Sequence, residues 1–155
     1  MKIAVVRVRG SVNTPAKIKD TLKMLHLLKV NHCIVIDDSP TYKGMLQKAK
    51  DWITWGEISE EMMTKLLEKR GRLPGNKRLT DEYIKENTKF KSIADFVKAF
   101  MEGKATLKDI PGLKPYFRLN PPRGGYEDLK KQYTNKGTLG YRGAGMDKLL
   151  KRMIR

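Results

Sequence analysis

The hydrophobic pattern of the first 58 residues switches repeatedly between the period of a strand and that of a helix. Residues 3–8 alternate and are β-branched, which is typical of a half-buried strand. Apolar side chains then recur at helical spacing, at Ile18, Leu22, Leu25 and Leu28. This alternation constrains the fold more than any other feature, because every element must bury its apolar side against a shared sheet.

Turn residues separate these elements. Thr14 and Pro15 predict the cap and first position of a helix of about 14 residues, and Asn31 predicts its end. The complete pattern predicts a β-α-β-α-β unit, with both helices on one face of the sheet. The other face is left to be covered or to bind a partner. The expected later elements are strands at 33–36 and 52–55 and a helix at about 41–50.

The pattern changes after Ile58, so we assign residues 1–58 to the core and 59–155 to a helical and loop-rich extension packed on or beside it. Ser59, Thr80 and Ser92 precede acidic or apolar helical starts and predict three helix caps. Residues 103–146 are rich in glycine and proline, which predicts loops with little regular structure. The expected core face of the third of these helices is Ile93, Phe96, Val97 and Phe100, and a short terminal helix is expected from Asp147.

The net charge of +16 argues for a polyanionic partner. Residues 1–60 hold 10 Lys/Arg and 6 Asp/Glu, whereas residues 61–155 hold 23 and 11, so the excess lies in the extension. A phosphate backbone is the favoured partner over an anionic membrane or a merely solvated basic surface. No apolar run approaches the length of a membrane span, and the first residues have no signal-peptide layout.

Catalytic and metal-binding patterns are weak. The chain has one cysteine, Cys33, and two histidines, His26 and His32, which is too few for a zinc site or a nucleophile–base pair. Asp37 and Asp38 follow a strand and suggest Mg²⁺ chemistry, but a strand-ending turn is the favoured interpretation. Neither a Walker spacing nor a complete dinucleotide-binding glycine pattern is present. We therefore expect no cofactor, no small-molecule substrate and no enzyme.

Glycine beside arginine is the strongest chemical feature. Residues 121–126 and 137–145 share this character, and glycine allows backbone amides to approach a phosphate closely. Tyr126 and Tyr141 in these segments are candidates for stacking on unpaired bases. The alternative is an ordinary surface loop with incidental cations. Trp52 and Trp55, three apart in a predicted strand, are expected on opposite faces, with packing favoured for both.

Several segments, in order along the whole chain, match a known family. The chain resembles archaeal members of the universal L-thirty family of large-subunit ribosomal proteins, whose eukaryotic members are called L-seven. The matching segments are Val8-Arg9-Gly10, Leu25-His26-Leu27-Leu28, residues 40–46, Ile53-Thr54-Trp55-Gly56, Arg78-Leu79-Thr80-Asp81, residues 120–125 and residues 146–153. The resemblance implies an α+β fold with a ferredoxin-like core, an antiparallel sheet and a basic helical extension. It also implies a cytoplasmic, ribosomal location and no catalytic residues.

The resemblance and the charge together lead us to expect a structural constituent of the large ribosomal subunit that binds rRNA and lies near other ribosomal proteins. A free RNA-binding assembly factor is the alternative, and a phosphate-ester enzyme acting through Asp37 and Asp38 is a third class. The expected RNA contacts are Arg7, Arg9, Lys43, Arg70, Arg72, Lys77, Arg78, Arg123, Gly124, Gly125, Tyr126, Tyr141, Arg142 and Arg152.

Overall fold

The predicted β-α-β-α-β order is confirmed by the computed structural model, which describes residues 2–154. The central strand, β1, pairs antiparallel with both β2 and β3, so that Val5 lies opposite Ile34 on one side and Trp55 on the other. The elements of this core are β1 (Lys2–Arg7), α1 (Ala16–Met24), β2 (His32–Asp37), α2 (Pro40–Lys48) and β3 (Ile53–Glu57).

Helix α1 is shorter than the sequence pattern predicts, with 9 residues. Thr14 does not cap it, because its hydroxyl donates to the Gly10 carbonyl at 3.3 Å and accepts from Trp52 Nε1 at 3.2 Å. Pro15 takes the cap position instead. His26 has a φ of 60°, a left-handed conformation that turns the chain away before Leu28, which is exposed.

The two tryptophans lie on the same side of the sheet, not on opposite sides as expected. Trp52 precedes β3, so the alternation of side chains along a strand does not apply to it. Both rings pack into the hydrophobic cluster under α1 and α2, and the prediction that both serve packing is confirmed.

The extension contributes further helices and further strands. Ser59, Thr80 and Ser92 each accept a hydrogen bond at the start of a helix, which confirms the three predicted caps. Its elements are α3 (Glu60–Arg70), β4 (Arg72–Leu73), β5 (Lys77–Arg78), α4 (Asp81–Asn87), α5 (Ile93–Met101), β6 (Phe117–Arg118), β7 (Asp128–Gln132), β8 (Gly137–Tyr141), α6 (Gly145–Met153) and the short 3₁₀ helices Leu107–Asp109 and Tyr133–Asn135.

The expectation that residues 103–146 lack regular structure is wrong, because three strands of this segment join the core sheet. The strand order is β6-β2-β1-β3-β8-β7. Strand β6 pairs antiparallel with β2, whereas β8 is parallel to β3 and β7 is parallel to β8. The antiparallel sheet expected for the core therefore holds for β1, β2 and β3, but the whole sheet is mixed. The β2–β6 and β3–β8 pairings join residues that are distant in sequence, so they leave no local hydrophobic period.

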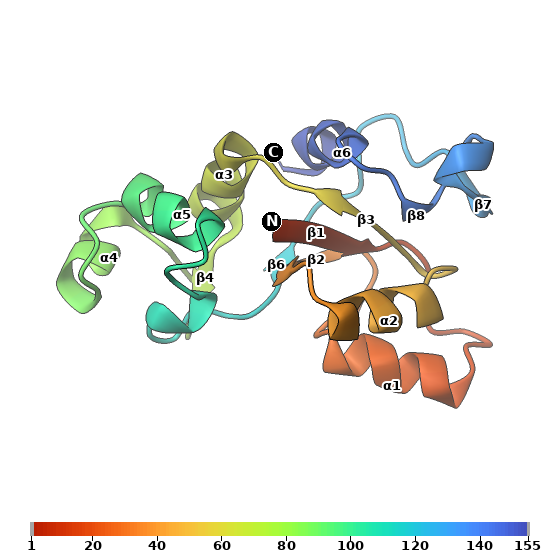
Figure 1. Ribbon diagram of the computed structural model, residues 1–155, viewed down its shortest axis with the longest axis horizontal. Helices are drawn as coiled ribbons and strands as arrows, with labels where there is room; N and C mark the ends of the chain where they lie inside the picture. Colours follow the sequence, from red (N-terminus) through yellow and green to blue (C-terminus); the bar gives the residue numbers. More distant parts are fainter. Residues whose placement is uncertain (1, 155) are drawn as a thin grey trace.

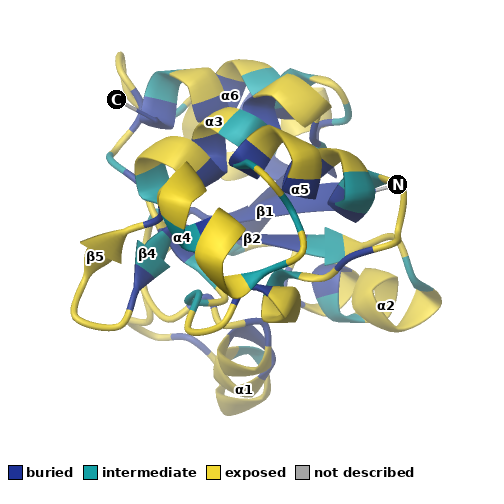
Figure 2. Ribbon diagram, turned by 90° about the vertical axis from the view of Figure 1, so that its left-hand side faces the viewer, coloured by how far each residue is buried: buried dark blue, intermediate teal, exposed yellow. Residues whose placement is uncertain are grey.

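Both faces of the sheet are covered, which gives three layers (Figures 1 and 2). The helices α1 and α2 cover the face that carries Ile3, Val5 and Ile34. The helices α3, α5 and α6 cover the opposite face, which carries Ala4 and Val6. The face that the core pattern left open is thus buried by the extension. The prediction that helices cover only one face of the sheet is therefore correct for the first 58 residues but wrong for the whole described structure.

No helix within residues 2–154 is long and apolar enough to span a bilayer. The four residues expected to form the core face of α5 are all buried: Ile93, Phe96, Val97 and Phe100.

The packing of α3, α5 and α6 predicts a large loss of stability when the side chain of Phe96 is truncated. Phe96 is fully buried and contacts Phe90 edge-on and Phe100 by stacking. Phe96→Ala should lower the free energy of unfolding by about 3–5 kcal/mol, measured by urea denaturation. Met24→Ala, at an exposed position, is the control and should change it by less than about 0.5 kcal/mol. Similar effects for both variants would contradict the packing described for α5.

Candidate RNA-binding surface

Arg7, expected as an RNA contact, is buried and committed to the fold. Its Nη1 donates to the Leu27 carbonyl at 2.8 Å, Nε to the Arg9 carbonyl at 2.9 Å and Nη2 to Ser11 Oγ at 2.6 Å. Burial lowers the pKa of Arg7 from its ordinary value. All three nitrogens of the side chain therefore hold the turn after β1, and none faces an external phosphate.

Arg142 is likewise buried, between β3 and β8. Its Nε donates to Thr54 Oγ1 at 2.8 Å, and its Nη2 donates to the Thr138 carbonyl at 2.8 Å. The guanidinium also lies 4.8 Å from the centroid of the Tyr133 ring and 3.9 Å from a Glu127 oxygen. Burial lowers the pKa of Arg142, and Glu127 opposes that shift. The side chain fastens β8 to the core sheet, so its expected role as an RNA contact is withdrawn.

Tyr126 is not free to stack on a base. Its hydroxyl donates to Asn31 Oδ1, and its ring packs beside the cluster under α3 and α6. Burial raises the pKa of Tyr126. The residue ties the glycine-rich loop to the turn before β2, which is a structural role that the sequence pattern did not indicate.

Loop 121–125 is fixed against the end of α6 by main-chain contacts. Arg152 Nε donates to the Arg123 carbonyl at 2.9 Å, and the Arg123 amide donates to the Arg152 carbonyl at 3.2 Å. Arg152 Nη2 also donates to the Gly125 carbonyl. Gly124 and Gly125 have φ values of 78° and 75°, a left-handed backbone that favours glycine. The exposed Arg123 side chain therefore projects from a braced loop rather than a flexible one.

A second group of cations lies where α3 ends. Arg70 Nη1 donates to the carbonyl of Arg118 at 3.4 Å. Arg72 and Arg78 are cross-strand partners in the β4–β5 hairpin, and the Lys114 amide donates to the Arg72 carbonyl at 3.0 Å. The exposed Arg118, which the sequence reasoning missed, adds a further cation. The only sequence feature that could have indicated Arg118 is its place next to Phe117, an apolar residue within a glycine- and proline-rich segment.

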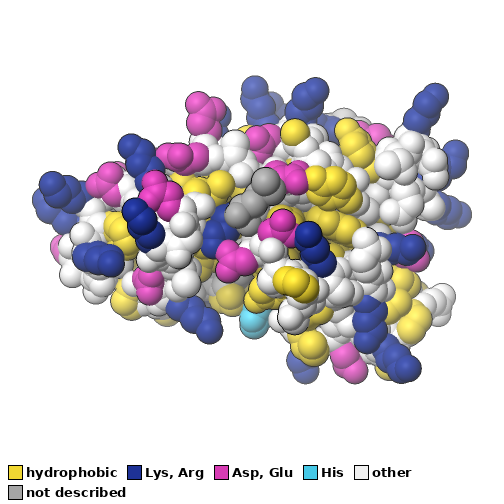
Figure 3. Space-filling model, viewed as in Figure 1, with side chains coloured by type: hydrophobic (Ala, Val, Ile, Leu, Met, Phe, Trp, Pro, Cys, Tyr) yellow, Lys and Arg dark blue, Asp and Glu magenta, His cyan; other side chains and the backbone are white. Residues whose placement is uncertain are grey.

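These two groups are joined by the chain between them, since the Asn120 amide donates to the Met153 carbonyl at 3.3 Å at the end of α6. We call the combined surface the basic end. Acidic and basic side chains mix over the middle of the face shown in Figure 3, and cations project around its rim. The basic end consists of Arg70, Arg72, Lys77, Arg78, Arg118, Arg123, Gly124, Gly125 and Arg152.

The remaining expected contacts lie away from the basic end. Lys43 and Tyr141 border a shallow hollow near the ends of β2 and β3. Lys43 Nζ is 3.1 Å from Asp38, and the Tyr141 hydroxyl donates to Glu57, which raises the pKa of Tyr141. Arg9 lies over Trp52, with its guanidinium 5.6 Å from the ring centroid.

The two aspartates proposed as an alternative Mg²⁺ site have cationic partners. Asp37 pairs with Lys2, and Asp38 pairs with Lys43. Within the described residues no group of three or more His, Cys, Asp or Glu side chains is placed to hold a metal ion. Burial raises the pKa of Cys33 to about 12, so its thiol stays protonated at neutral pH.

Residues 3–53 match the family model described as ribosomal protein L30p/L7e. The large ribosomal subunit protein uL30 of Methanosphaera stadtmanae is 54% identical over 151 residues, which cover 97% of this chain and 99% of the relative. The proteins of the same name from Archaeoglobus fulgidus and Methanopyrus kandleri are 55% and 53% identical, over 97% and 94% of the chain and 98% and 99% of their own lengths.

The chain belongs to the L30p/L7e family of ribosomal proteins. The resemblance noted in the sequence is therefore confirmed. The family consists of structural ribosomal proteins and not of enzymes, which agrees with the weak catalytic patterns. The likeness extends through the extension, because the archaeal relatives match over nearly their full length.

The different surroundings of two arginines predict different effects on stability. Arg142→Ala leaves the Thr138 carbonyl and Thr54 hydroxyl without their buried donor, and should lower the free energy of unfolding by about 2–4 kcal/mol. Arg123→Ala removes an exposed side chain while keeping the main-chain contacts, and should change it by less than about 0.5 kcal/mol. Urea denaturation of both variants measures the difference, and equal effects would refute the structural role of Arg142.

The buried environment of His32 predicts that the protein loses stability in mild acid. It is buried, stacks on Tyr116 with ring centroids 5.0 Å apart, and has an Nδ1 without a hydrogen-bond partner among the described residues. Burial first, and then Arg118, Lys29 and Arg7, lower its pKa in the folded state. Because the unfolded chain binds the proton more readily, His32 stabilises the fold above its ordinary pKa of 6.5 and loses that contribution as the pH falls through this value.

His32→Phe keeps an aromatic ring against Tyr116 but cannot be protonated. The decrease in unfolding free energy between pH 7.5 and pH 5.5 should therefore be smaller in this variant than in the unmodified protein. Urea titrations at the two pH values measure both differences. An equal decrease in the two proteins would show that His32 does not contribute.

Proposed function

We propose that this chain is a structural constituent of the large ribosomal subunit and binds rRNA through the basic end. Membership of a ribosomal protein family supports assembly into the ribosome. Hydrogen bonds that link α3, the β4–β5 hairpin, β6, loop 121–125 and the end of α6 support the surface, because these segments carry seven Lys/Arg residues. The observation that carries the proposal is the bracing of this surface: Arg152 and the Arg123 amide hold loop 121–125 against the end of α6, and Arg70 donates to the Arg118 carbonyl. A backbone that is already ordered loses less entropy on binding phosphates than a flexible one.

The proposed mechanism is electrostatic. The basic end neutralises phosphates of the rRNA, which gives affinity, and the shape of the RNA gives most of the specificity. Exposed backbone at Gly124 and Gly125 lets a phosphate approach closely. Lys43, Tyr141 and Arg9 lie on other parts of the surface, so they form secondary contacts with a different RNA segment in this proposal.

We further propose the partition of the chain into a core of residues 1–58 and an extension of residues 59–155. Neighbouring ribosomal proteins are proposed as additional partners, and the cytoplasmic ribosome as the location, as expected for this family. No observation favours the alternative of a free assembly factor. Co-sedimentation of the chain with intact large subunits in high salt tests this point, because an assembly factor leaves mature particles.

The electrostatic mechanism predicts a strong dependence of affinity on salt. If about six phosphates are neutralised, the logarithm of the association constant should fall with the logarithm of salt concentration at a slope of about −4 to −5. Fluorescence anisotropy with labelled large-subunit rRNA fragments measures this slope. The double variant Arg78→Ala/Arg123→Ala should make the slope less steep by about 1.5, since two contacts are lost.

A matched control removes the same charge elsewhere. Lys17 and Lys19 are exposed on α1, which lies on the opposite side of the sheet from α3 and α6. Lys17→Ala/Lys19→Ala should leave the slope nearly unchanged. Equal changes in the two double variants would mean that net charge, and not the basic end, determines RNA binding.

A further inference from the structure

The outer edge of β2 lacks a strand partner along most of its length, although Ile34 and Val35 are themselves only 3% and 7% exposed and Ile36 is half-buried. Strand β6 pairs with it only at His32 and Cys33, so residues 34–37 have no strand on that side. No hydrogen bond joins residues 34–36 to segment 102–116 within the described part of the chain. Because every second residue of a strand directs its N–H and C=O toward each neighbour, this edge presents unpaired backbone donors and acceptors.

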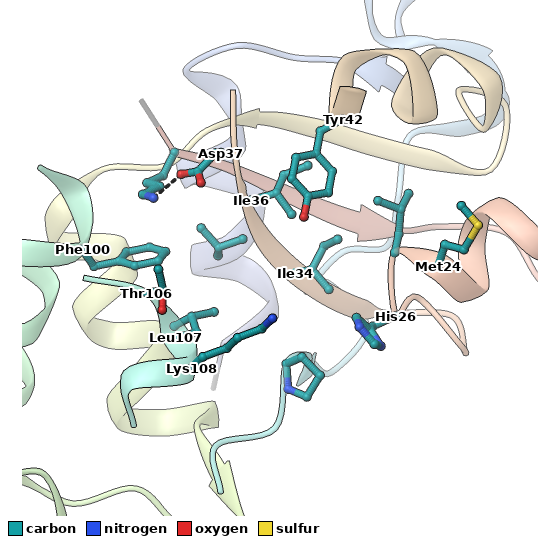
Figure 4. Close-up of a pocket in the computed structure, with 14 residues that line it drawn as sticks. Met24, His26, Ile34, Ile36, Asp37, Tyr42, Phe100, Thr106, Leu107 and Lys108 are labelled. Carbon is teal, nitrogen blue, oxygen red and sulfur yellow. Dashed lines mark hydrogen bonds and ion pairs between the residues drawn. The ribbon is translucent and has the colours of Figure 1, made fainter. Parts of the chain in front are cut away.

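A groove of about 380 Å³ runs along this open edge (Figure 4). One wall carries Met24 and Tyr42, which are 65% and 37% exposed. The other wall carries Phe100 and Leu107 from the extension. The side chains of an added strand would alternate between these two walls, since successive residues point to opposite faces. Because Met24, Tyr42, Phe100 and Leu107 are apolar or aromatic, the side chains that face these four residues are expected to be apolar.

The charged residues that line the groove restrict which kind of segment can bind there. Lys2 lies at one end, where it pairs with Asp37 and places its Nζ 4.4 Å from the centroid of Phe100. That cation is therefore already compensated. Lys108 lines the opposite wall, is exposed, and forms no ion pair within residues 2–154. An acidic side chain beside Lys108 would complement it, in keeping with the net charge of +16.

The same features disfavour RNA as the occupant. A nucleic-acid backbone requires several cations or amide donors aimed at its phosphates. The groove offers one uncompensated lysine, beside His26, between walls of methionine, leucine, tyrosine and phenylalanine. The basic end, by contrast, supplies seven Lys/Arg residues elsewhere on the surface.

We propose that an extended polypeptide segment of a neighbouring protein adds to the outer edge of β2 as a further strand. Its backbone pairs with residues 34–36, its alternating apolar side chains fill the two walls, and an acidic side chain contacts Lys108. Strand addition to an exposed sheet edge is an established mode of peptide recognition, in which main-chain hydrogen bonds give affinity and flanking pockets give specificity.

The test is photocrosslinking in assembled particles, and so it rests on the proposed ribosomal function. Tyr42 or, in a second protein, Lys108 is replaced by photoreactive p-benzoylphenylalanine, which probes the two walls separately. A third protein carries the same group at Lys148, an exposed position on α6. Incorporation into large subunits is measured first by sedimentation, so that failure of the proposed function is recognised before irradiation.

Mass spectrometry then identifies the crosslinked species. We expect both groove positions to crosslink to the same short polypeptide segment, with apolar residues at alternate positions and an acidic residue among them. Crosslinks to rRNA from the groove positions would overturn the proposal in favour of RNA. An absence of groove crosslinks, together with crosslinks from Lys148, would show that the groove is unoccupied and would also overturn it.

A charge reversal separates the proposed contact from general effects on assembly. Lys108→Glu, combined with the photoreactive group at Tyr42, should reduce the peptide crosslink about threefold to tenfold, because the acidic side chain meets a like charge. Lys104→Glu in the same background is the control: Lys104 is exposed, pairs with Glu102 and does not line the groove. Equal yields in the two variants would refute the acidic contact at Lys108.

Discussion

Burial of both faces of the central sheet is the constraint on which the rest of this structure depends. Every residue of β1 is buried, including Lys2 and Arg7, because α1 and α2 cover one face and α3, α5 and α6 cover the other. A sheet of three short strands with one uncovered apolar face would leave Ala4, Val6 and Val35 in water. The extension is therefore a layer of the fold as well as a carrier of positive charge.

The same constraint explains why arginine plays two different parts. Arg7 and Arg142 lie where strands must be fastened to turns or to each other, and their donors are used by carbonyl and hydroxyl oxygens of the protein. A guanidinium has five donors in a rigid fork, so it can satisfy several buried acceptors at once. Arg123 differs because its loop reaches the surface, where the side chain can meet phosphate. Arg152 is intermediate between the two: its Nε and Nη2 donate to carbonyls of loop 121–125, and its Nη1 lies 3.6 Å from Glu127, so it mainly braces that loop.

The surface divides into regions of different chemistry. The basic end offers braced cations and exposed glycine backbone, which suits a polyanion of extended shape. The open edge of β2 offers unpaired backbone groups between apolar walls, which suits a polypeptide. The two proposed contacts need both surfaces on one rigid body, and the three-layer packing supplies that rigidity.

The sequence by itself determined the features that depend on local chemistry. The β-α-β-α-β order follows from hydrophobic periods, and the caps at Ser59, Thr80 and Ser92 follow from residues next to each helix. The net charge gives the expectation of a polyanionic partner. Only the tertiary structure decided that β6 and β8 extend the sheet and that Arg7, Tyr126 and Arg142 face inward. The partners of these residues are distant in sequence: Arg142 contacts Thr54, and Tyr126 contacts Asn31. Whether an arginine meets water or a buried carbonyl depends on such long-range packing, which leaves no period along the chain.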